Sequence, residues 1–233
     1  VRPGYEGTYT APFRSHLEVF EVISEAMHRA DVDGLLSIDA AASEFTERGG
    51  YRLQPEGVAL SAERLCAEYQ SWARRFPLKL IEDPVAEDDW EGWRQAVAVL
   101  QPSLQLVGDD FLTTNPARIR RALDEGLRVA VLLKPNQIGT ITETVEAKTL
   151  ADAAGVPTVM SNRSGETLDP FIADLAVALG CTYLKSGGPF APERACPAPP
   201  PPPAPSSTAP LFVPTAPVPV EQSWLPPGPA LCD

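Results

Sequence analysis

Short apolar runs alternate with longer helical patterns from residue 16 to about residue 186. The apolar runs hold four to six residues, mostly Val, Ile and Leu, which predicts buried strands. The longer stretches repeat apolar residues every three or four positions, as in helices buried on one side. The predicted strands are Leu35–Asp39, Leu78–Glu82, Leu104–Asp109, Val129–Lys134, Thr158–Ser161 and Thr182–Ser186. The predicted helices are His16–Ala30, Leu60–Arg75, Asp88–Leu100, Pro116–Glu125, Ile141–Ala154 and Leu168–Leu179.

Single helices between successive strands indicate parallel βα units, because a parallel crossover needs a dozen or more residues. From Leu78 onward the predicted strands begin 24 to 29 residues apart. This spacing suits a (β/α) barrel and a doubly wound sheet equally well. No GxGxxG motif follows any strand, which disfavours a dinucleotide-binding fold.

The carboxyl end of every predicted strand is polar or charged. One such end is ordinary, but six in succession predict a ring of side chains at the C-terminal face of a barrel. In (β/α) barrels this face carries the active site. The ring comprises Asp39, Glu82 with Asp83, Asp109 with Asp110, Lys134, Ser161 to Ser164, and Lys185. Helix capping and strand-end solvation would explain any one of these residues better than they explain the set.

Proline divides the chain. Fourteen of the 26 prolines lie after residue 196, including the run from Pro199 to Pro203. Such a segment cannot bury enough surface to offset its ordering entropy. We therefore expect an α/β fold, an incomplete (β/α) barrel over residues 1–195, and a disordered Pro-rich tail over residues 196–233. The proline run could dock to an SH3- or WW-type groove, but a spacer or an appended gene end is the favoured interpretation.

Charge and cysteine content limit the classes of partner and compartment. The net charge of −12 argues against a general binder of nucleic acid or of anionic membranes. No apolar stretch is long enough to span a bilayer. The four cysteines form no CxxC pair, so reduced thiols and a cytoplasmic location are expected. The chain begins without Met and without a signal peptide, which favours a fragment.

Three carboxylates on successive strands, Asp39, Glu82 and Asp109, would converge in a closed barrel. Oxygen ligands without Cys or His suit Mg²⁺, and a metal would offset the repulsion between the anions. Opposite them, Arg163 offers a planar fork for phosphate or carboxylate. A lysine beside other cations loses its proton more readily, so Lys134 or Lys185 could act as a base. Metal, base and anion clamp together favour proton abstraction next to a carboxylate.

At these residues the sequence resembles the enolase (phosphopyruvate hydratase) family, over about Gly4 to Arg194. Enolase-superfamily sites pair a Lys or His base with one or two Mg²⁺ ions. Six motifs in one order carry the resemblance: Ser37-Ile38-Asp39-Ala40-Ala41-Ala42-Ser43-Glu44-Phe45; Ile81-Glu82-Asp83-Pro84 with Glu87-Asp88-Asp89-Trp90; Val107-Gly108-Asp109-Asp110 with Thr114-Asn115-Pro116; Leu133-Lys134-Pro135-Asn136-Gln137-Ile138-Gly139-Thr140; Arg163-Ser164-Gly165-Glu166-Thr167; and Leu184-Lys185-Ser186-Gly187-Gly188.

The resemblance implies a reaction, a cofactor and a role for each site residue. The reaction is the reversible dehydration of 2-phosphoglycerate to phosphoenolpyruvate in glycolysis, with Mg²⁺ as cofactor and a homodimer as the intact protein. Lys134 would take the C2 proton of the substrate, and Glu6, in a weaker match at Gly4 to Gly7, would protonate the departing hydroxyl. The metal ligands would be Asp39, Glu82 and Asp109, and the substrate contacts Arg163 and Ser164 at the phosphate, Lys185 at the carboxylate, and Asn162.

Three departures from the family pattern keep other interpretations open. Asn162 stands where the family has a His, and it can donate a hydrogen bond but carries no charge. Pro135 after the expected base replaces a Val and removes a backbone donor. The family's N-terminal domain, first barrel strands and terminal helix have no counterpart in the chain. The alternatives are an enolase-like binding or structural protein with weakened catalysis, and a related lyase or racemase acting on another carboxylate. The retained phosphate loop argues against the second alternative.

Overall fold

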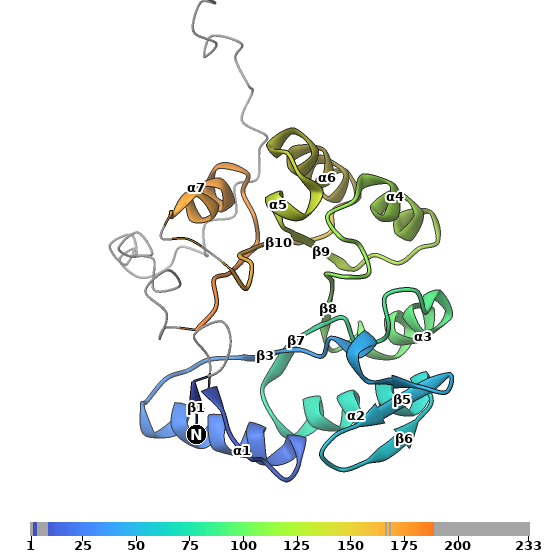
Figure 1. Cartoon of the computed structure of the whole chain (residues 1–233), viewed down its shortest axis with the longest axis vertical. Coiled ribbons are helices and arrows are strands. Elements are labelled where there is room, and N and C mark those ends of the chain that lie inside the picture. The colour runs from blue at the N-terminus through green and yellow to red at the C-terminus, as the bar shows by residue number, and fades with distance from the viewer. Residues whose placement is uncertain (1, 4–8, 166, 168, 189–233) are drawn as a thin grey trace, which may run out of the picture. The chain divides into compact units, whose positions relative to one another are not determined.

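The computed structural model describes residues 2–3, 9–165, 167 and 169–188 (Figure 1). At its centre is a parallel sheet with the order β11-β10-β9-β8-β7-β3. The chain therefore adds each strand beside the previous one in the same direction. A doubly wound sheet would reverse its order, so this topology is that of a (β/α) barrel. The strands are β3 (Leu36–Asp39), β7 (Leu78–Glu82), β8 (Gln105–Gly108), β9 (Ala130–Leu133), β10 (Thr158–Ser161) and β11 (Tyr183–Lys185).

The barrel is incomplete. Within the described residues, β3 and β11 each pair with one neighbour only, so they form the two edges of the sheet. Figure 1 shows the sheet curled, with helices around its outer side. The incomplete α/β barrel expected from the sequence is thereby confirmed. The predicted tail, residues 196–233, lies outside the described residues.

Six of the helices match the sequence-based prediction within about three residues. Their starts follow the expected caps: Ser61 accepts a hydrogen bond from the amide of Arg64, and Asn115 accepts one from Ala117 ahead of Pro116. Gly155 ends its helix with a φ of 64°, which glycine adopts readily. The helices are α1 (His16–Arg29), α2 (Ala62–Arg75), α3 (Trp90–Leu100), α4 (Pro116–Asp124), α6 (Ile141–Ala154) and α7 (Phe171–Ala178), with the short α5 (Pro135–Ile138) before α6.

The central strands β8, β9 and β10 are almost entirely buried on both faces, which explains why they are mostly apolar. One set of alternate residues, including Leu106, Val131 and Met160, belongs to the large core that also contains the helices. The other set lies on the inner face of the sheet and forms a small second cluster of Val107, Ala130, Leu132 and Val159, with Leu80 packed against it.

A small antiparallel sheet between β3 and α2 was not predicted. It consists of β4 (Thr46–Glu47), β5 (Gly50–Leu53) and β6 (Val58–Leu60). Its Tyr51 hydroxyl donates to the Asp89 carboxylate at 2.7 Å and accepts from the Ala86 amide at 3.0 Å. The side chain therefore ties this sheet to the segment after β7. Two further short strands, β1 (Arg2–Pro3) and β2 (Tyr9–Thr10), pair with each other, and a 3₁₀ turn, η2, spans Ala42–Phe45.

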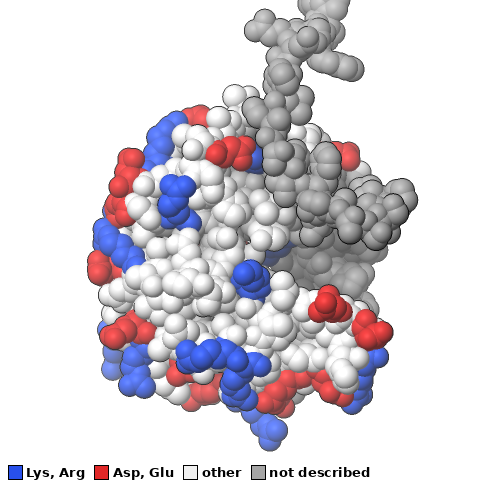
Figure 2. Space-filling view, turned by 180° about the vertical axis from the view of Figure 1, so that it is seen from behind, with Lys and Arg blue, Asp and Glu red and all other residues white. Residues whose placement is uncertain are grey.

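The surface is mixed in charge. Figure 2 shows Lys and Arg interspersed with Asp and Glu around the rim of one face. Several of these groups pair on the surface, including Arg94 with Glu125 and Arg120 with Glu146. Exposed pairs of this kind contribute about 0–1 kcal/mol each, so the fold rests mainly on its apolar core. None of the described helices is long and apolar enough to cross a bilayer.

Candidate active site

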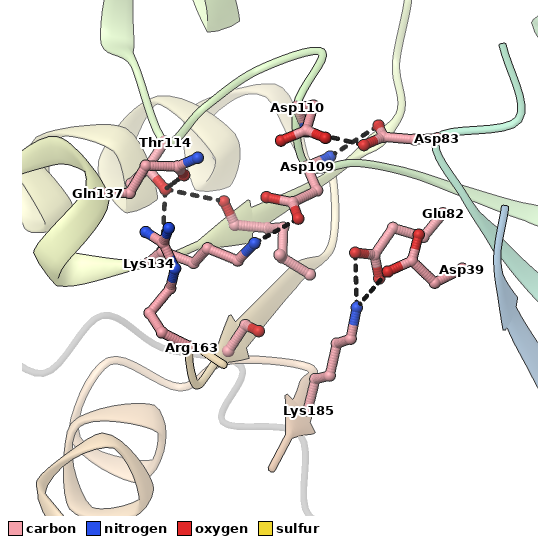
Figure 3. A network of polar contacts seen from close by, with 12 residues as sticks. Asp39, Glu82, Asp83, Asp109, Asp110, Thr114, Lys134, Gln137, Arg163 and Lys185 are labelled. Carbon is pink, nitrogen blue, oxygen red and sulfur yellow. Dashed lines mark hydrogen bonds and ion pairs between the residues drawn. The ribbon is translucent and has the colours of Figure 1, made fainter. Parts of the chain in front are cut away.

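The strand register brings the predicted site residues to one end and one face of the sheet. Asp39 is paired with Glu82, and Glu82 with Val107. Val107 lies on the inner face, so Glu82 and Asp39 point inward, and so does Asp109, two residues after Val107. The same alternation from Leu132 places Lys134 on the inner face, and the pairing of Ser161 with Lys185 brings β11 into the set. Figure 3 shows these side chains facing one another.

Lys185 contacts two of the three predicted metal ligands. Its Nζ atom donates to Oδ2 of Asp39 at 2.8 Å and to Oε1 of Glu82 at 2.7 Å (Figure 3). Burial raises the pKa of Glu82 to about 8, the negative charges of Asp39 and Asp109 also raise it, and Lys185 offsets only part of the rise. Burial alone would lower the pKa of Lys185, but Glu82 and Asp39 outweigh burial and hold that pKa above its ordinary value. Lys185 is therefore a stable cation, suited to holding an anion rather than to accepting a proton.

Lys134 contacts the third predicted ligand. Its ammonium group pairs with Oδ2 of Asp109, and both side chains are largely buried (Figure 3). The other oxygen of Asp109, Oδ1, is among the few buried side-chain atoms of the described region that have no hydrogen-bond partner. A buried, unpartnered carboxylate oxygen is a free position for a cation.

Asp83 holds the end of β8 against the end of β7, a role the sequence did not reveal. Its two carboxylate oxygens accept the backbone amides of Asp109 at 3.0 Å and of Asp110 at 2.8 Å. The residue has a φ of 41°, which is uncommon for any residue except glycine. Burial raises the pKa of Asp83 to about 7, although the two amide hydrogen bonds lower it. The sequence offered one signal for this role, a second acid directly after Glu82. From the sequence alone, Asp83 belonged to the ring of polar strand ends without a separate role.

The acidic cluster that could hold a metal ion differs from the predicted ligand set. Ligand atoms of Asp83, Asp109 and Asp110 lie within 4.8 Å of one another, whereas Asp39 and Glu82 share Lys185. Asp109 belongs to both sets, and its Oδ1 atom is the unpartnered one. The oxygen donors of both sets fit a hard divalent cation such as Mg²⁺. The set of Asp39, Glu82 and Asp109 stays a prediction.

The residues expected to bind phosphate follow β10. The Asn162 side chain donates to the carbonyl of Ser186 at 3.2 Å, and its backbone amide donates to the carbonyl of Lys185 at 3.0 Å. Arg163 donates from Nη1 to the side chain of Asn136 at 3.4 Å, beside α5. Asn162 thus connects this segment to the end of β11, and Arg163 connects it to the segment after Lys134. Ser164 adjoins them in sequence, and Glu6, the predicted acid, lies outside the described residues.

Parallel strands joined by helices, with carboxylates and lysines meeting at the strand ends, define a (β/α)-barrel enzyme domain. Comparison with known proteins identifies the family. Residues 2–197 match the family described as "Enolase, C-terminal TIM barrel domain". The chain belongs to the enolase family, which is a family of lyases.

The chain is similar to curated enolases from bacteria and archaea. It is 43% identical over 195 residues to "Enolase" of Natranaerobius thermophilus and to "Enolase 2" of Pseudomonas syringae pv. syringae. It is 46% identical over 195 residues to "Enolase 2" of Methanospirillum hungatei. Each comparison covers 82% of this chain but 46% of the relative, so the chain spans less than half the length of these proteins.

Proposed function

We propose that the chain carries the barrel part of an enzyme that reversibly dehydrates 2-phosphoglycerate to phosphoenolpyruvate in glycolysis. The observation that carries this proposal is the convergence of Asp39, Glu82, Asp109, Lys134 and Lys185 from five strands at one end of the barrel. Membership of the enolase family supports the choice of reaction.

Asp39, Glu82 and Asp109 would hold Mg²⁺. Bound there, the ion would supply positive charge that stabilises the dianion formed when a carboxylate substrate loses its α-proton. The chain prepares the site by burying Glu82 and by leaving one oxygen of Asp109 unpartnered. Lys185 and Lys134 now neutralise these carboxylates, so both lysines are placed to turn toward an anionic substrate once a metal is bound.

Lys134 would remove the proton from C2 of 2-phosphoglycerate as the general base. The bond from C3 to the hydroxyl then breaks, Glu6 donates a proton to the leaving oxygen, and water and a C2–C3 double bond result. The family resemblance assigns the role of base to Lys134, whereas Asp39 and Glu82 both stabilise the protonated form of Lys185. Lys185 would instead contact the substrate carboxylate.

Arg163 and Ser164 would bind the substrate phosphate, and Asn162 would position this segment. Arg163 offers a planar pair of donors suited to phosphate oxygens. Asn162 already uses its side-chain donor on the carbonyl of Ser186, so its contribution is to join the phosphate segment to the strand that carries Lys185. A second candidate function follows from this residue. An uncharged Asn162 favours an enolase-like binding or structural protein with weakened catalysis.

The proposal extends to compartment and assembly. Cys66 and Cys181 are free thiols, as is usual in a reducing compartment, which supports a cytoplasmic location. A homodimer is proposed for the intact protein from the family resemblance alone.

An assay of phosphoenolpyruvate formation tests the reaction. It would use the gene product that contains this chain, 2-phosphoglycerate and saturating Mg²⁺, with a chelator as the blank. We expect metal-dependent turnover that Lys134→Ala abolishes and that Lys79→Ala, at an exposed position of β7, leaves intact. Binding of 2-phosphoglycerate without turnover would support the second candidate. Turnover that survives Lys134→Ala would overturn the role of Lys134.

A further inference from the structure

We infer that Thr114 is a positioning residue that sets the place of Lys134; this inference rests on the proposed role of Lys134 as the base. Thr114 follows β8 and is fully buried. Its hydroxyl oxygen accepts a hydrogen bond from the backbone amide of Lys134 at 2.9 Å and donates to the carbonyl of Leu132 at 3.2 Å. The Thr114 side chain, which follows β8, thus contacts the backbone at the C-terminal end of β9 at two points.

The amide of Lys134 needs such a partner because of where the sheet ends. The last described pairing between β8 and β9 joins Gly108 with Val131, so Lys134 lies beyond that ladder. A buried amide without a partner is unfavourable, and a threonine hydroxyl can accept one hydrogen bond while donating another. Beyond Lys134 the chain turns into α5, and the amide of Gln137 donates to the Lys134 carbonyl at 2.9 Å. Both backbone groups of Lys134 are therefore fixed.

The backbone conformation of Thr114 indicates that the surrounding structure determines where its hydroxyl lies. Thr113 and Thr114 have φ values of 50° and 55°, in the left-handed region that β-branched residues rarely adopt. Such conformations persist where the surrounding structure determines them. Here the segment turns from the Asp109 loop into α4, where the Asn115 side chain accepts a hydrogen bond from the amide of Ala117, and this turn points the Thr114 hydroxyl at β9.

The same geometry links the base to the metal side of the site. Asp109 begins the loop that ends at Thr114, and the Lys134 ammonium pairs with Asp109. Lys134 is therefore held at its backbone by one end of this loop and at its side chain by the other. A shift of about 1 Å in a reacting group can lower a rate on the order of a hundredfold. By fixing the position of Lys134, the Thr114 hydroxyl can therefore affect the rate of proton removal.

Three variants test the inference. Thr114→Val keeps the shape and removes the hydroxyl, and Thr114→Ser keeps the hydroxyl. Thr144→Val is the matched control, because Thr144 is also fully buried and donates to a carbonyl, that of Thr140, inside α6. The first readout is hydrogen exchange of the Lys134 amide in the 233-residue chain, followed by NMR. It needs no enolase activity, so it decides this inference even if the proposed reaction is wrong.

We expect Thr114→Val to speed exchange of the Lys134 amide about tenfold or more relative to other amides of β9. Thr114→Ser should restore it, and Thr144→Val should not change it selectively. In an active gene product, Thr114→Val should lower kcat roughly tenfold to a hundredfold with KM within about twofold. Selective protection of Lys134 that survives Thr114→Val, or an equal kcat loss in Thr144→Val, would overturn the inference. If Thr114→Val does not fold, the wild-type chain still provides a test. A Lys134 amide that exchanges there as fast as in an unstructured peptide would overturn the inference.

Discussion

Replacing Lys185 with methionine removes one ammonium group from between two carboxylates and keeps most of the apolar side chain. Lys185 donates to Asp39 and to Glu82, so the variant leaves both without their cation. A divalent metal bound by these carboxylates would supply the missing charge. The loss of stability in Lys185→Met should therefore depend on whether Mg²⁺ is present.

The contacts bound the size of the effect. At 2.7 Å and an effective dielectric constant of about 20, Coulomb's law gives roughly 6 kcal/mol for the pair with Glu82. That value is an upper limit, because the Lys185 side chain is 33% exposed and water screens it. Asp39, 43% exposed, contributes about 0–1 kcal/mol, whereas breaking a buried pair costs about 3–5 kcal/mol. Because Glu82 can take up a proton, we expect a loss of about 2–4 kcal/mol without metal.

The assay is urea unfolding followed by tryptophan fluorescence, with chelator and with Mg²⁺ in large excess. A ligand that binds only the folded state stabilises it by RT ln(1 + c/Kd), where c is the free ligand concentration, so Mg²⁺ in large excess should bring Lys185→Met closer to the wild type. Lys148→Met is the control, since Lys148 pairs with the exposed Asp152 on α6, away from the candidate metal ligands, and its small loss of stability should not depend on Mg²⁺. An equal loss in Lys185→Met with chelator and with Mg²⁺ would refute the reasoning that lysine and metal occupy the same carboxylates.

Three further predictions follow from the same carboxylates and from the sheet edges. Glu82 and Asp83 have pKa values raised from 4.5 to about 8 and from 3.8 to about 7, so the folded chain keeps protons that the unfolded chain has lost. Without metal, the free energy of unfolding should thus fall as pH rises through that window, by about 1.4 kcal/mol per pH unit for each fully shifted group. Urea unfolding at a series of pH values from 5 to 8 checks this. If the slope of the free energy of unfolding against pH is the same in Glu82→Gln as in the wild type, the prediction is contradicted. Asp83→Asn leaves one of two backbone amides without an acceptor and should cost about 1–3 kcal/mol in urea unfolding, with Asp110→Asn as the milder control. If the proposed function is right, the 233-residue chain should turn over 2-phosphoglycerate far more slowly than the longer relatives, because β3 and β11 are the open edges of the sheet that the described residues form. Comparable turnover in a side-by-side assay, lost in Lys134→Ala, would contradict this.

Much of the fold could be predicted because its central strands are buried on both faces. Their apolar runs and the capped helices between them are strong local signals, and β7 and β10 are confirmed residue for residue. The small sheet of β4, β5 and β6 was missed because its strands are short and partly exposed, and because Tyr51 is ordered by partners after β7. The order of the strands in the sheet distinguishes a barrel from a doubly wound sheet. The spacing of the strands along the sequence is the same for both folds, so it could not decide between them.

The sequence predicted that the polar strand ends lie together, but it did not predict which of them pair. Polar residues at strand ends identified Asp39, Glu82, Asp109, Lys134 and Lys185, and the register confirms that they share one face. The sequence could not show that each lysine neutralises carboxylates, since this depends on the curl of the sheet. It placed Asp83 at a strand end but did not show that Asp83 binds the backbone just after β8.

The contact between Lys185 and Asp39 has a consequence for the order of folding. It joins the two edge strands, which are not paired through their backbones in the described sheet, across 146 residues of sequence. Closing so long a loop carries an entropic cost that local contacts avoid, so neighbouring βα units should associate first. The ionic contact then forms only when the last strand has added to the sheet. We therefore expect the contact of Lys185 with Asp39 and Glu82 to form last in folding, and a chain stalled before β11 would hold these two carboxylates without Lys185 between them.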